Sequence, residues 1–339
     1  MYRGIIAVII SISLSLLLFA CNKQQNNISY TNANQDMILS NEASTINNLI
    51  IEKNEDGSLS EPKNNEDNDE RQSQTKKDNL GSKDEKVGSV SNYVYQPNNQ
   101  VQKQSENTNV SNRKYSWSFV RKKDHLPPVL QKQQVDLAQK FNAIYLGDTS
   151  KKVIYLTFDE GYENGYTSKI LDTLKENNVK AAFFITMPYL KSQFDLVDRM
   201  VKEGHAVGNH TVHHPSMPEV TDDKKLEQEL LELDLLFRAK TGIDMKYLRP
   251  PKGEYSERTL KISRELGYRN VFWSLAYADW DVNKQRGTEY AHKIVLDNIH
   301  NGAVLLLHAV SKDNAEALGN IISDLKAQGY TFGKLDDLK

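Results

Sequence analysis

The chain has 339 residues, which is enough for one or two domains with a large core. Its formal net charge is -2, from 43 Lys and Arg against 45 Asp and Glu. Because nucleic-acid-binding proteins carry a basic excess, we expect no nucleic-acid partner. The chain has a single cysteine, Cys21, so a disulfide framework within one chain is excluded.

The N-terminus has the pattern of an export signal. Arg3 precedes a nearly apolar run over residues 5–20, which is as long as a signal-peptide core and short for a membrane-spanning helix. The run closes on Leu18-Phe19-Ala20-Cys21, which resembles a bacterial lipobox. This resemblance implies a lipoprotein signal peptide over residues 1–21 with Cys21 lipidated. The alternative is an uncleaved signal anchor, and both readings place the remaining chain outside the cytoplasm at a membrane.

Residues 22–114 are dominated by Asn, Gln, Ser, Lys, Glu and Asp, and their apolar residues show no lasting period. Such a segment cannot bury enough apolar surface to offset the entropy lost on ordering, so we predict a disordered stalk. Aromatic residues return at Tyr115, Trp117 and Phe119. We therefore expect one folded domain over residues 115–339.

Short apolar runs alternate with amphipathic segments through this domain. The apolar runs predict strands over residues 153–158, 181–186, 206–207, 247–248, 270–274, 303–307 and 330–332. Helices are predicted over residues 134–141, 167–177, 193–203, 221–240, 256–266, 289–300 and 313–328. Repeated strand-helix-strand units indicate a parallel α/β sheet, and about seven strands indicate a closed or nearly closed barrel.

Polar clusters follow the carboxyl ends of several predicted strands. They are Asp159-Glu160, His210–His214, Arg249–Gly253, Asp279-Trp280 and His308. In an α/β barrel the carboxyl ends of the strands form the face that carries active sites. The sequence therefore predicts one site at this face.

His210 and His214 are four residues apart and could join a carboxylate as metal ligands. Three protein ligands with an open position are typical of a catalytic zinc-type site, although a histidine-rich surface loop is the alternative. His308 ends an apolar strand and suits a general acid, or else a satisfied core histidine. Arg249 precedes two prolines and needs a carboxylate partner if buried, for which Asp159 is the candidate.

Asp279 could orient His308 in the same way that Arg249 holds Asp159. Trp280 offers an apolar face on which sugars and acyl groups pack, but it would also be unremarkable in a core.

These motifs together resemble one known family. The matching stretches are Thr157-Phe158-Asp159-Glu160-Gly161, His210-Thr211-x-x-His214-Pro215, Arg249-Pro250-Pro251-x-Gly253, Asp279-Trp280 and Leu307-His308. They resemble the polysaccharide deacetylase family, the NodB-homology or carbohydrate esterase 4 group, over residues 115–339. The resemblance implies a distorted (β/α)7 barrel of the NodB-homology type.

Further stretches resemble one branch of that family, the delta-lactam-biosynthetic de-N-acetylases. They are Tyr115-Ser116-Trp117, the run from Tyr145 to Lys152, the run from Glu163 to Thr167, and Ser311-Lys312-Asp313-Asn314-Ala315. Members of this branch remove the acetyl group from N-acetylmuramic acid in peptidoglycan, and the freed amine forms the muramic δ-lactam of spore cortex.

The resemblance implies a role for each matching residue. Asp159 would be the general base, and Glu160, His210 and His214 would hold a divalent metal, Zn or alternatively Co, Mn or Mg. Glu160 stands where the family usually has Asp, and its extra methylene changes the ligand geometry.

The same resemblance assigns the residues around the substrate. Lys252 would stabilise the oxyanion through its backbone N–H, and Gly253 lies beside it in the substrate-binding set. Arg249 would tune Asp159, and His308, oriented by Asp279, would protonate the leaving amine. Trp280 would wall the acetyl pocket.

Muramic acid carries a lactyl carboxylate that glucosamine lacks, and Lys252, Lys312 and Arg249 are the cations expected to read it. We therefore expect a monomeric, membrane-anchored lipoprotein that faces the cell wall and deacetylates N-acetylmuramic acid in peptidoglycan glycan strands. The alternatives are an N-acetylglucosamine deacetylase and an inactive glycan-binding protein on the same fold.

Overall fold

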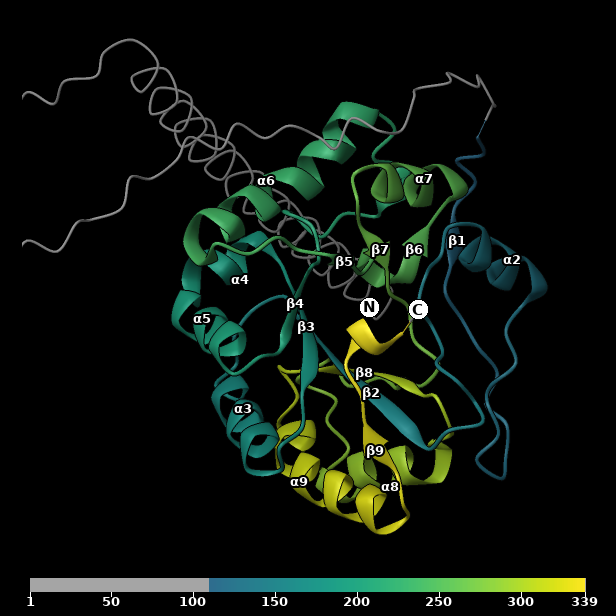
Figure 1. The fold of residues 1–339 in the computed structure, drawn as a ribbon, viewed down its shortest axis with the longest axis vertical. Helices are drawn as coiled ribbons and strands as arrows, with labels where there is room; N and C mark the ends of the chain where they lie inside the picture. The colour runs from purple at the N-terminus through teal and green to yellow at the C-terminus, as the bar shows by residue number, and fades with distance from the viewer. Residues whose placement is uncertain (1–109, 339) are drawn as a thin grey trace, which may run out of the picture. The chain divides into compact units, whose positions relative to one another are not determined.

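The computed structural model of the protein describes residues 110–338 (Figure 1). The expected signal peptide, the lipidation site Cys21 and nearly all of the expected stalk lie outside the described residues. Between residues 110 and 338, no helix is long and apolar enough to cross a membrane.

Seven strands of the described chain form one sheet in the order β7-β5-β4-β3-β2-β8, with β9 pairing β2. Every one of these pairings is parallel. The strands are β2 (Val153–Glu160), β3 (Ala181–Ile185), β4 (Ala206–Asn209), β5 (Tyr247–Leu248), β7 (Arg269–Asn270), β8 (Val304–His308) and β9 (Thr331–Phe332). A strand stands at each of the seven predicted places.

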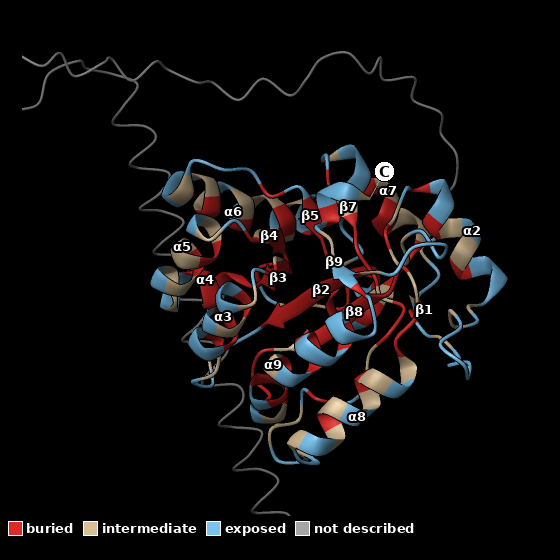
Figure 2. Ribbon diagram, turned by 60° about the horizontal axis from the view of Figure 1, so that its bottom comes forward, coloured by how far each residue is buried: buried red, intermediate tan, exposed pale blue. Residues whose placement is uncertain are grey.

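Helices surround this sheet, and Figure 2 shows buried residues gathered in the strands and exposed residues on the outer sides of the helices. The helices are α2 (Lys132–Lys140), α3 (Thr167–Glu176), α4 (Met187–Ser192), α5 (Phe194–Lys202), α6 (Asp223–Thr241), α7 (Glu257–Glu265), α8 (Thr288–Asn298) and α9 (Lys312–Ala327). This curled parallel sheet with outer helices confirms the expected distorted α/β barrel. The sequence did not predict α4, nor the small antiparallel pair β1 (Tyr115–Ser116) and β6 (Glu254–Tyr255).

Local sequence signals account for several helix ends. Asp222 caps α6, because its side chain accepts hydrogen bonds from the backbone N–H groups of Lys224 and Lys225. Gly242 ends the same helix with φ 74°, a conformation that glycine adopts without steric cost. Ser256 caps α7 in the same way as Asp222 caps α6.

The barrel is closed between β7 and β8 by irregular pairing. The sequence predicted a strand over residues 270–274, but β7 ends at Asn270. Val271 then bridges Ile144, and Leu275 bridges Leu305 of β8. The chain therefore crosses from one edge of the sheet towards the other, which shortens the regular strand.

The N-terminal segment packs against the barrel. The ring of Trp117 stacks on Phe272, with ring centroids 4.2 Å apart, and its indole N–H donates to the carbonyl of Trp273 at 2.8 Å. Asn112 donates to the carbonyl of Pro218 at 2.9 Å and accepts from the Ser256 hydroxyl at 2.8 Å. Contacts to the domain therefore begin before Tyr115, the expected domain start.

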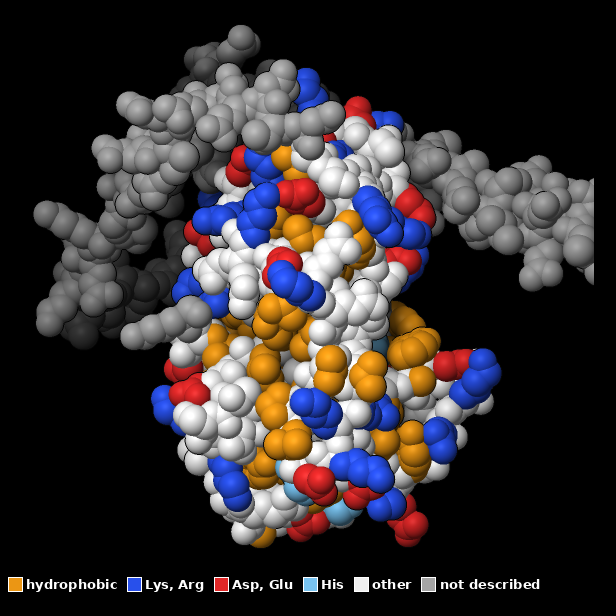
Figure 3. All heavy atoms as spheres, turned by 90° about the vertical axis from the view of Figure 1, so that its right-hand side faces the viewer, with side chains coloured by type: hydrophobic (Ala, Val, Ile, Leu, Met, Phe, Trp, Pro, Cys, Tyr) orange, Lys and Arg blue, Asp and Glu red, His pale blue; other side chains and the backbone are white. Residues whose placement is uncertain are grey.

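Figure 3 shows the face on the right-hand side of Figure 1, where α2 and β1 lie. Basic, acidic and apolar side chains are interspersed on this face. No single sign of charge covers it, as the small net charge of the chain predicts.

Candidate active site

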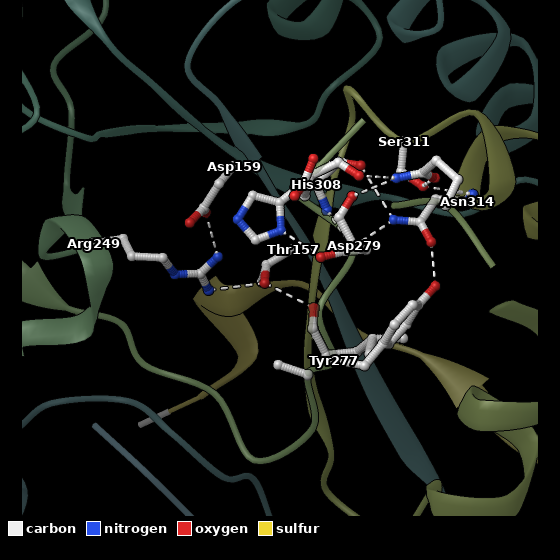
Figure 4. A network of polar contacts seen from close by, with 12 residues as sticks. Thr157, Asp159, Arg249, Tyr277, Asp279, His308, Ser311 and Asn314 are labelled. Atoms are coloured by element: carbon white, nitrogen blue, oxygen red, sulfur yellow. Dashed lines mark hydrogen bonds and ion pairs between the residues drawn. The ribbon is translucent and has the colours of Figure 1, made fainter. Parts of the chain in front are cut away.

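The expected clusters meet at the carboxyl edge of the sheet. Asp159 lies at the end of β2 and His308 at the end of β8, and the two are register partners. His210 follows β4, and Arg249 follows β5. Because the strands are parallel, these ends lie on one edge, and Figure 4 shows Asp159, Arg249, Asp279 and His308 together there.

Arg249 holds Asp159 in a buried ion pair. Its Nη1 donates to Asp159 Oδ1 at 2.7 Å, and its Nη2 donates to the Thr157 hydroxyl at 2.8 Å. Its Nε donates to the carbonyl of Val271 at 3.1 Å, so all three guanidinium nitrogens have partners. Burial alone would raise the pKa of Asp159, but the charge of Arg249, followed by that of His308, holds it below its usual range. Asp159 is therefore an ionised carboxylate.

His210 is fixed in one tautomer. Its Nδ1 lies 2.8 Å from the carbonyl oxygen of Arg249, which can only accept, so Nδ1 carries the proton. The other nitrogen, Nε2, lies 3.5 Å from Asp159 Oδ2. The ring of His214 lies edge-on to that of His210, with centroids 4.8 Å apart. Burial lowers the pKa of both rings, to about 4 for His214, so both are neutral and able to bind a metal.

The loop that carries these histidines is held by hydrogen bonds in a strained conformation. Thr211 and His214 have φ of 70° and 56°, in the left-handed region that non-glycine residues rarely adopt. Asn209 Oδ1 accepts from the Thr211 N–H at 2.8 Å, and the Thr211 hydroxyl accepts from the His214 N–H at 2.9 Å. His213 instead points to Glu229 on α6, with Nδ1 2.6 Å from Oε1.

Glu160 lies on the other face of β2. The strand continues through Glu160, which pairs in register with Ile185 of β3. Successive side chains of a strand point to opposite faces. Thr157 and Asp159 both contact Arg249, whereas Glu160 follows Phe158 on the face covered by the outer helices.

The surroundings of Glu160 differ from those of a metal ligand. Its Oε2 lies 3.5 Å from the hydroxyl of Thr167 at the start of α3. Its Oε1 is buried and has no hydrogen-bond partner among the described residues. Burial, followed by the charges of Glu163 and Asp159, raises the pKa of Glu160 well above its usual value. Glu160 is therefore a buried carboxyl group that favours the neutral form.

His308 pairs with Asp279. Its Nδ1 lies 2.7 Å from Asp279 Oδ1, and its backbone N–H donates to Asp279 Oδ2 at 2.9 Å. Burial lowers the pKa of His308, but the charge and hydrogen bond of Asp279 and the charge of Asp159 outweigh it and raise the pKa overall. Nε2 of a protonated His308 is thus a proton donor. Trp280 is 58% exposed, with its ring centroid 5.9 Å from that of His308.

The loop after β5 begins at Arg249, whose carbonyl bonds to His210. Lys252 has φ 59° and is exposed, and its charge helps lower the pKa of His214. Gly253 has φ 65°, and a Cβ there would meet the ring of Trp273 at 2.7 Å. Only glycine fits this position. Lys312 lies at the start of α9, where its ammonium group is 3.8 Å from Glu316 Oε1.

Comparison with known proteins identifies the family. A family model described as polysaccharide deacetylase matches residues 146–271. The peptidoglycan-N-acetylmuramic acid deacetylase PdaA of Bacillus subtilis is 49% identical over 230 residues, which cover 68% of this chain and 87% of that protein. The chain belongs to the polysaccharide deacetylase family.

Two further comparisons agree with this assignment. The solved structure of Bacillus subtilis PdaA, a family 4 carbohydrate esterase, matches with a TM-score of 0.66 and 47% identity, covering 68% of this chain and 98% of that one. An uncharacterized 30.6 kDa protein of Geobacillus stearothermophilus is 54% identical over 230 residues, which cover 68% of this chain and 86% of that protein.

Polysaccharide deacetylases of this family are generally metal-dependent. Within residues 110–338, no three His, Cys, Asp or Glu side chains are arranged to hold a metal ion. The expected set of Glu160, His210 and His214 is therefore not assembled, because the pleat of β2 directs Glu160 away from Asp159. His210 and His214 are both neutral, as metal ligands must be, and a backbone carbonyl fixes the His210 ring as in known metal sites.

Sequence reasoning assigned no role to several residues that support the site. The Thr157 hydroxyl accepts a hydrogen bond from Arg249. Thr157 lies two residues before Asp159 in one strand, and this spacing, which places both side chains on one face, was the signal in the sequence. Asn209 supports the histidine loop from the position directly before His210. Asn314 contacts the Asp279–His308 pair, and Tyr277 in turn bonds to Asn314, which lies in a stretch that resembles the family branch.

Proposed function

We propose that this polysaccharide deacetylase hydrolyses the N-acetyl group of N-acetylmuramic acid in peptidoglycan, which leads to muramic δ-lactam. The observation that carries the proposal is the pairing of an ionised Asp159 with a His308 of raised pKa, side by side at the end of the barrel. A base and an acid of this kind suit amide hydrolysis, which needs both. The 49% identity to PdaA supports muramic acid as the sugar.

The residues divide the reaction between them. Asp159 takes a proton from water, whose oxygen then adds to the acetyl carbonyl carbon. The C–N bond breaks as His308 gives its Nε2 proton to the nitrogen, so that acetate and a free amine leave. The backbone N–H of Lys252 stabilises the oxyanion. A divalent metal held by His210 and His214 would polarise the carbonyl and lower the pKa of the attacking water.

We propose that Lys252 recognises the lactyl carboxylate of the substrate. Of the three cations expected for this role, Arg249 is fully buried and bonded to Asp159, and Lys312 lies near Glu316. Lys252 is exposed, and its charge acts on the His214 ring. The K252A variant should lose part of its preference for muramic acid over glucosamine, whereas K312A should keep it. Equal preference in wild type and K252A would contradict this assignment.

We further propose that the enzyme acts outside the cytoplasm as a monomer. The signal-like residues 1–21 would anchor it through a lipid on Cys21, and residues 22–114 would extend the catalytic domain into the cell wall. Mass analysis of the membrane-extracted protein tests the anchor, because a diacylglyceryl group on Cys21 has a defined mass. An unmodified cysteine within an intact N-terminus would show an uncleaved signal anchor instead.

The central experiment measures acetate release by the full-length protein from peptide-free peptidoglycan strands, with and without chelator. Mass analysis of the sugar products identifies the deacetylated residue. We expect acetate from muramic acid, suppressed by chelator. Loss from glucosamine would assign the other sugar, and no release from any strand would indicate a glycan-binding protein.

A further inference from the structure

A buried amide lies behind the Asp279–His308 pair. Asn314, in the first turn of α9, is 1% exposed. Its Nδ2 donates to Asp279 Oδ2 at 2.6 Å and to the carbonyl of His308 at 3.1 Å. Its Oδ1 accepts from the hydroxyl of Tyr277, as Figure 4 shows. One amide therefore bonds to the carboxylate, to the histidine backbone and to the tyrosine.

These bonds fix which way the amide faces. The Asp279 carboxylate and the His308 carbonyl are acceptors, so both need the Nδ2 donors of Asn314. The Tyr277 hydroxyl supplies a donor that only Oδ1 can accept. A flipped amide would place an oxygen against the Asp279 carboxylate and a donor against the tyrosine proton. Tyr277 therefore opposes the flip.

The amide in turn fixes the Asp279 carboxylate. Asp279 Oδ1 is the acceptor for His308 Nδ1, and Oδ2 accepts from both the His308 N–H and Asn314 Nδ2. A carboxylate held at both oxygens cannot rotate without breaking hydrogen bonds in a buried environment, where unpaired polar groups are costly. The orientation of this carboxylate sets where Nε2 of His308 points.

We infer that Asn314 is a positioning residue, held in its orientation by Tyr277, that aims His308 Nε2 at the leaving nitrogen through Asp279. Its effect on turnover rests on the proposed deacetylase function. Its effect on the His308 ring does not, because that follows from the hydrogen bonds alone. The alternative is that Asn314 only stabilises the start of α9.

Two variants of the full-length protein test the inference. Asn314→Leu keeps the branching of the side chain but removes its donors and acceptor, and Tyr277→Phe removes only the hydroxyl. Tyr268→Phe is the matched control, because Tyr268 donates to Asp234 Oδ2 at 3.0 Å away from the catalytic pair. The measurements are kcat and KM on peptidoglycan strands, and the ¹⁵N-histidine NMR signal of the His308 Nδ1–H, assigned by its loss in H308Q.

We expect N314L to lower kcat by about 10–100-fold with little change in KM, as for a misaligned catalytic group. Y277F should lower kcat by a smaller factor, and Y268F should match wild type. The His308 Nδ1–H signal should weaken or disappear in N314L and shift in Y277F. A purely structural role would lower thermal stability but leave both kcat and this signal unchanged in the folded variants.

Wild-type kcat and an unchanged His308 signal in both variants would overturn the inference. If N314L does not fold, Y277F decides alone, since it removes one hydroxyl from a half-buried ring. If the wild type releases no acetate, the proposed function fails. The NMR signal still tests the positioning of His308 in that case.

Discussion

Asp159 and His308 are register partners on the adjacent parallel strands β2 and β8. Register partners point to the same face, and neighbouring strands lie about 4.8 Å apart. The proposed base and acid are therefore placed by the sheet itself. Each has its own buried partner, Arg249 for Asp159 and Asp279 for His308, so the two halves of the reaction can be perturbed separately.

Removing the charge of Asp279 should move the alkaline decline of the pH–rate profile to lower pH. His308 must be protonated to act, and Asp279 raises its pKa above the ordinary 6.5. In D279N the pKa of His308 falls, so kcat/KM should decline at lower pH than in wild type. We expect kcat to fall on the order of 10²-fold or more at neutral pH. D281N, which lies two residues further along the same loop, is the control. If kcat/KM of D279N declined at the same alkaline pH as kcat/KM of the wild type, the assignment would be contradicted.

Removing Arg249 should affect both stability and the acid side of the profile. R249M leaves the buried Asp159 without its cation, which should cost about 3–5 kcal/mol in the free energy of unfolding. The pKa of Asp159 should rise, so the acid limb of the kcat/KM profile should move to higher pH. Urea unfolding and a pH–rate profile measure these effects. K202M, which breaks the exposed ion pair between Lys202 and Asp198, should cost about 1 kcal/mol or less.

Measurements of metal affinity should distinguish the two histidines, as proposed ligands, from Glu160. H210Q and H214Q should each lower metal affinity about tenfold or more, because each removes a proposed ligand. E160Q should bind metal as wild type does, since its side chain lies on the opposite face of β2. Equilibrium dialysis followed by elemental analysis measures this. A comparable loss in E160Q would show that Glu160 is a ligand, which would require the end of β2 to separate from β3.

Glu160 should also make stability depend on pH. Its pKa is raised in the folded state, so the folded protein binds this proton more tightly than the unfolded chain. Stability from this group is therefore greatest below pH 4.5, the ordinary value, and falls as pH rises above it.

E160Q should accordingly match wild type near pH 4 and exceed it at pH 8, by on the order of 1–3 kcal/mol. Thermal unfolding across this range measures the difference, with E176Q on an exposed side chain as control. A difference that does not grow with pH would mean that Glu160 is not held neutral.

Much of the fold could be predicted because its signals are local. Most strands of the barrel lie in short apolar runs, and Asp222, Gly242 and Ser256 mark helix ends through their own caps. Parallel topology then requires the strand ends to meet at one edge. That step predicted the meeting of Asp159, Arg249 and His308 without any tertiary information.

The errors came from strand ends and from non-local contacts. The sequence placed the end of β2 at Phe158, whereas pairing with β3 extends it to Glu160. A strand that ended earlier would have released Glu160 from the pleat and allowed it to join Asp159. The role of Asn314 depends on the start of α9 meeting a loop 35 residues earlier in the chain, which no local pattern reveals.

The N-terminal segment has a practical consequence for anyone who shortens this protein. Asn112 bonds to Pro218, four residues beyond His214, and the Trp117 N–H bonds to the carbonyl of Gly253, next to Lys252. Both loops that carry proposed site residues are thus tied to residues next to the expected stalk. Truncation at Tyr115, where the aromatic residues return, would delete Asn112 and loosen the histidine loop. A recombinant domain intended for assays should begin no later than residue 110.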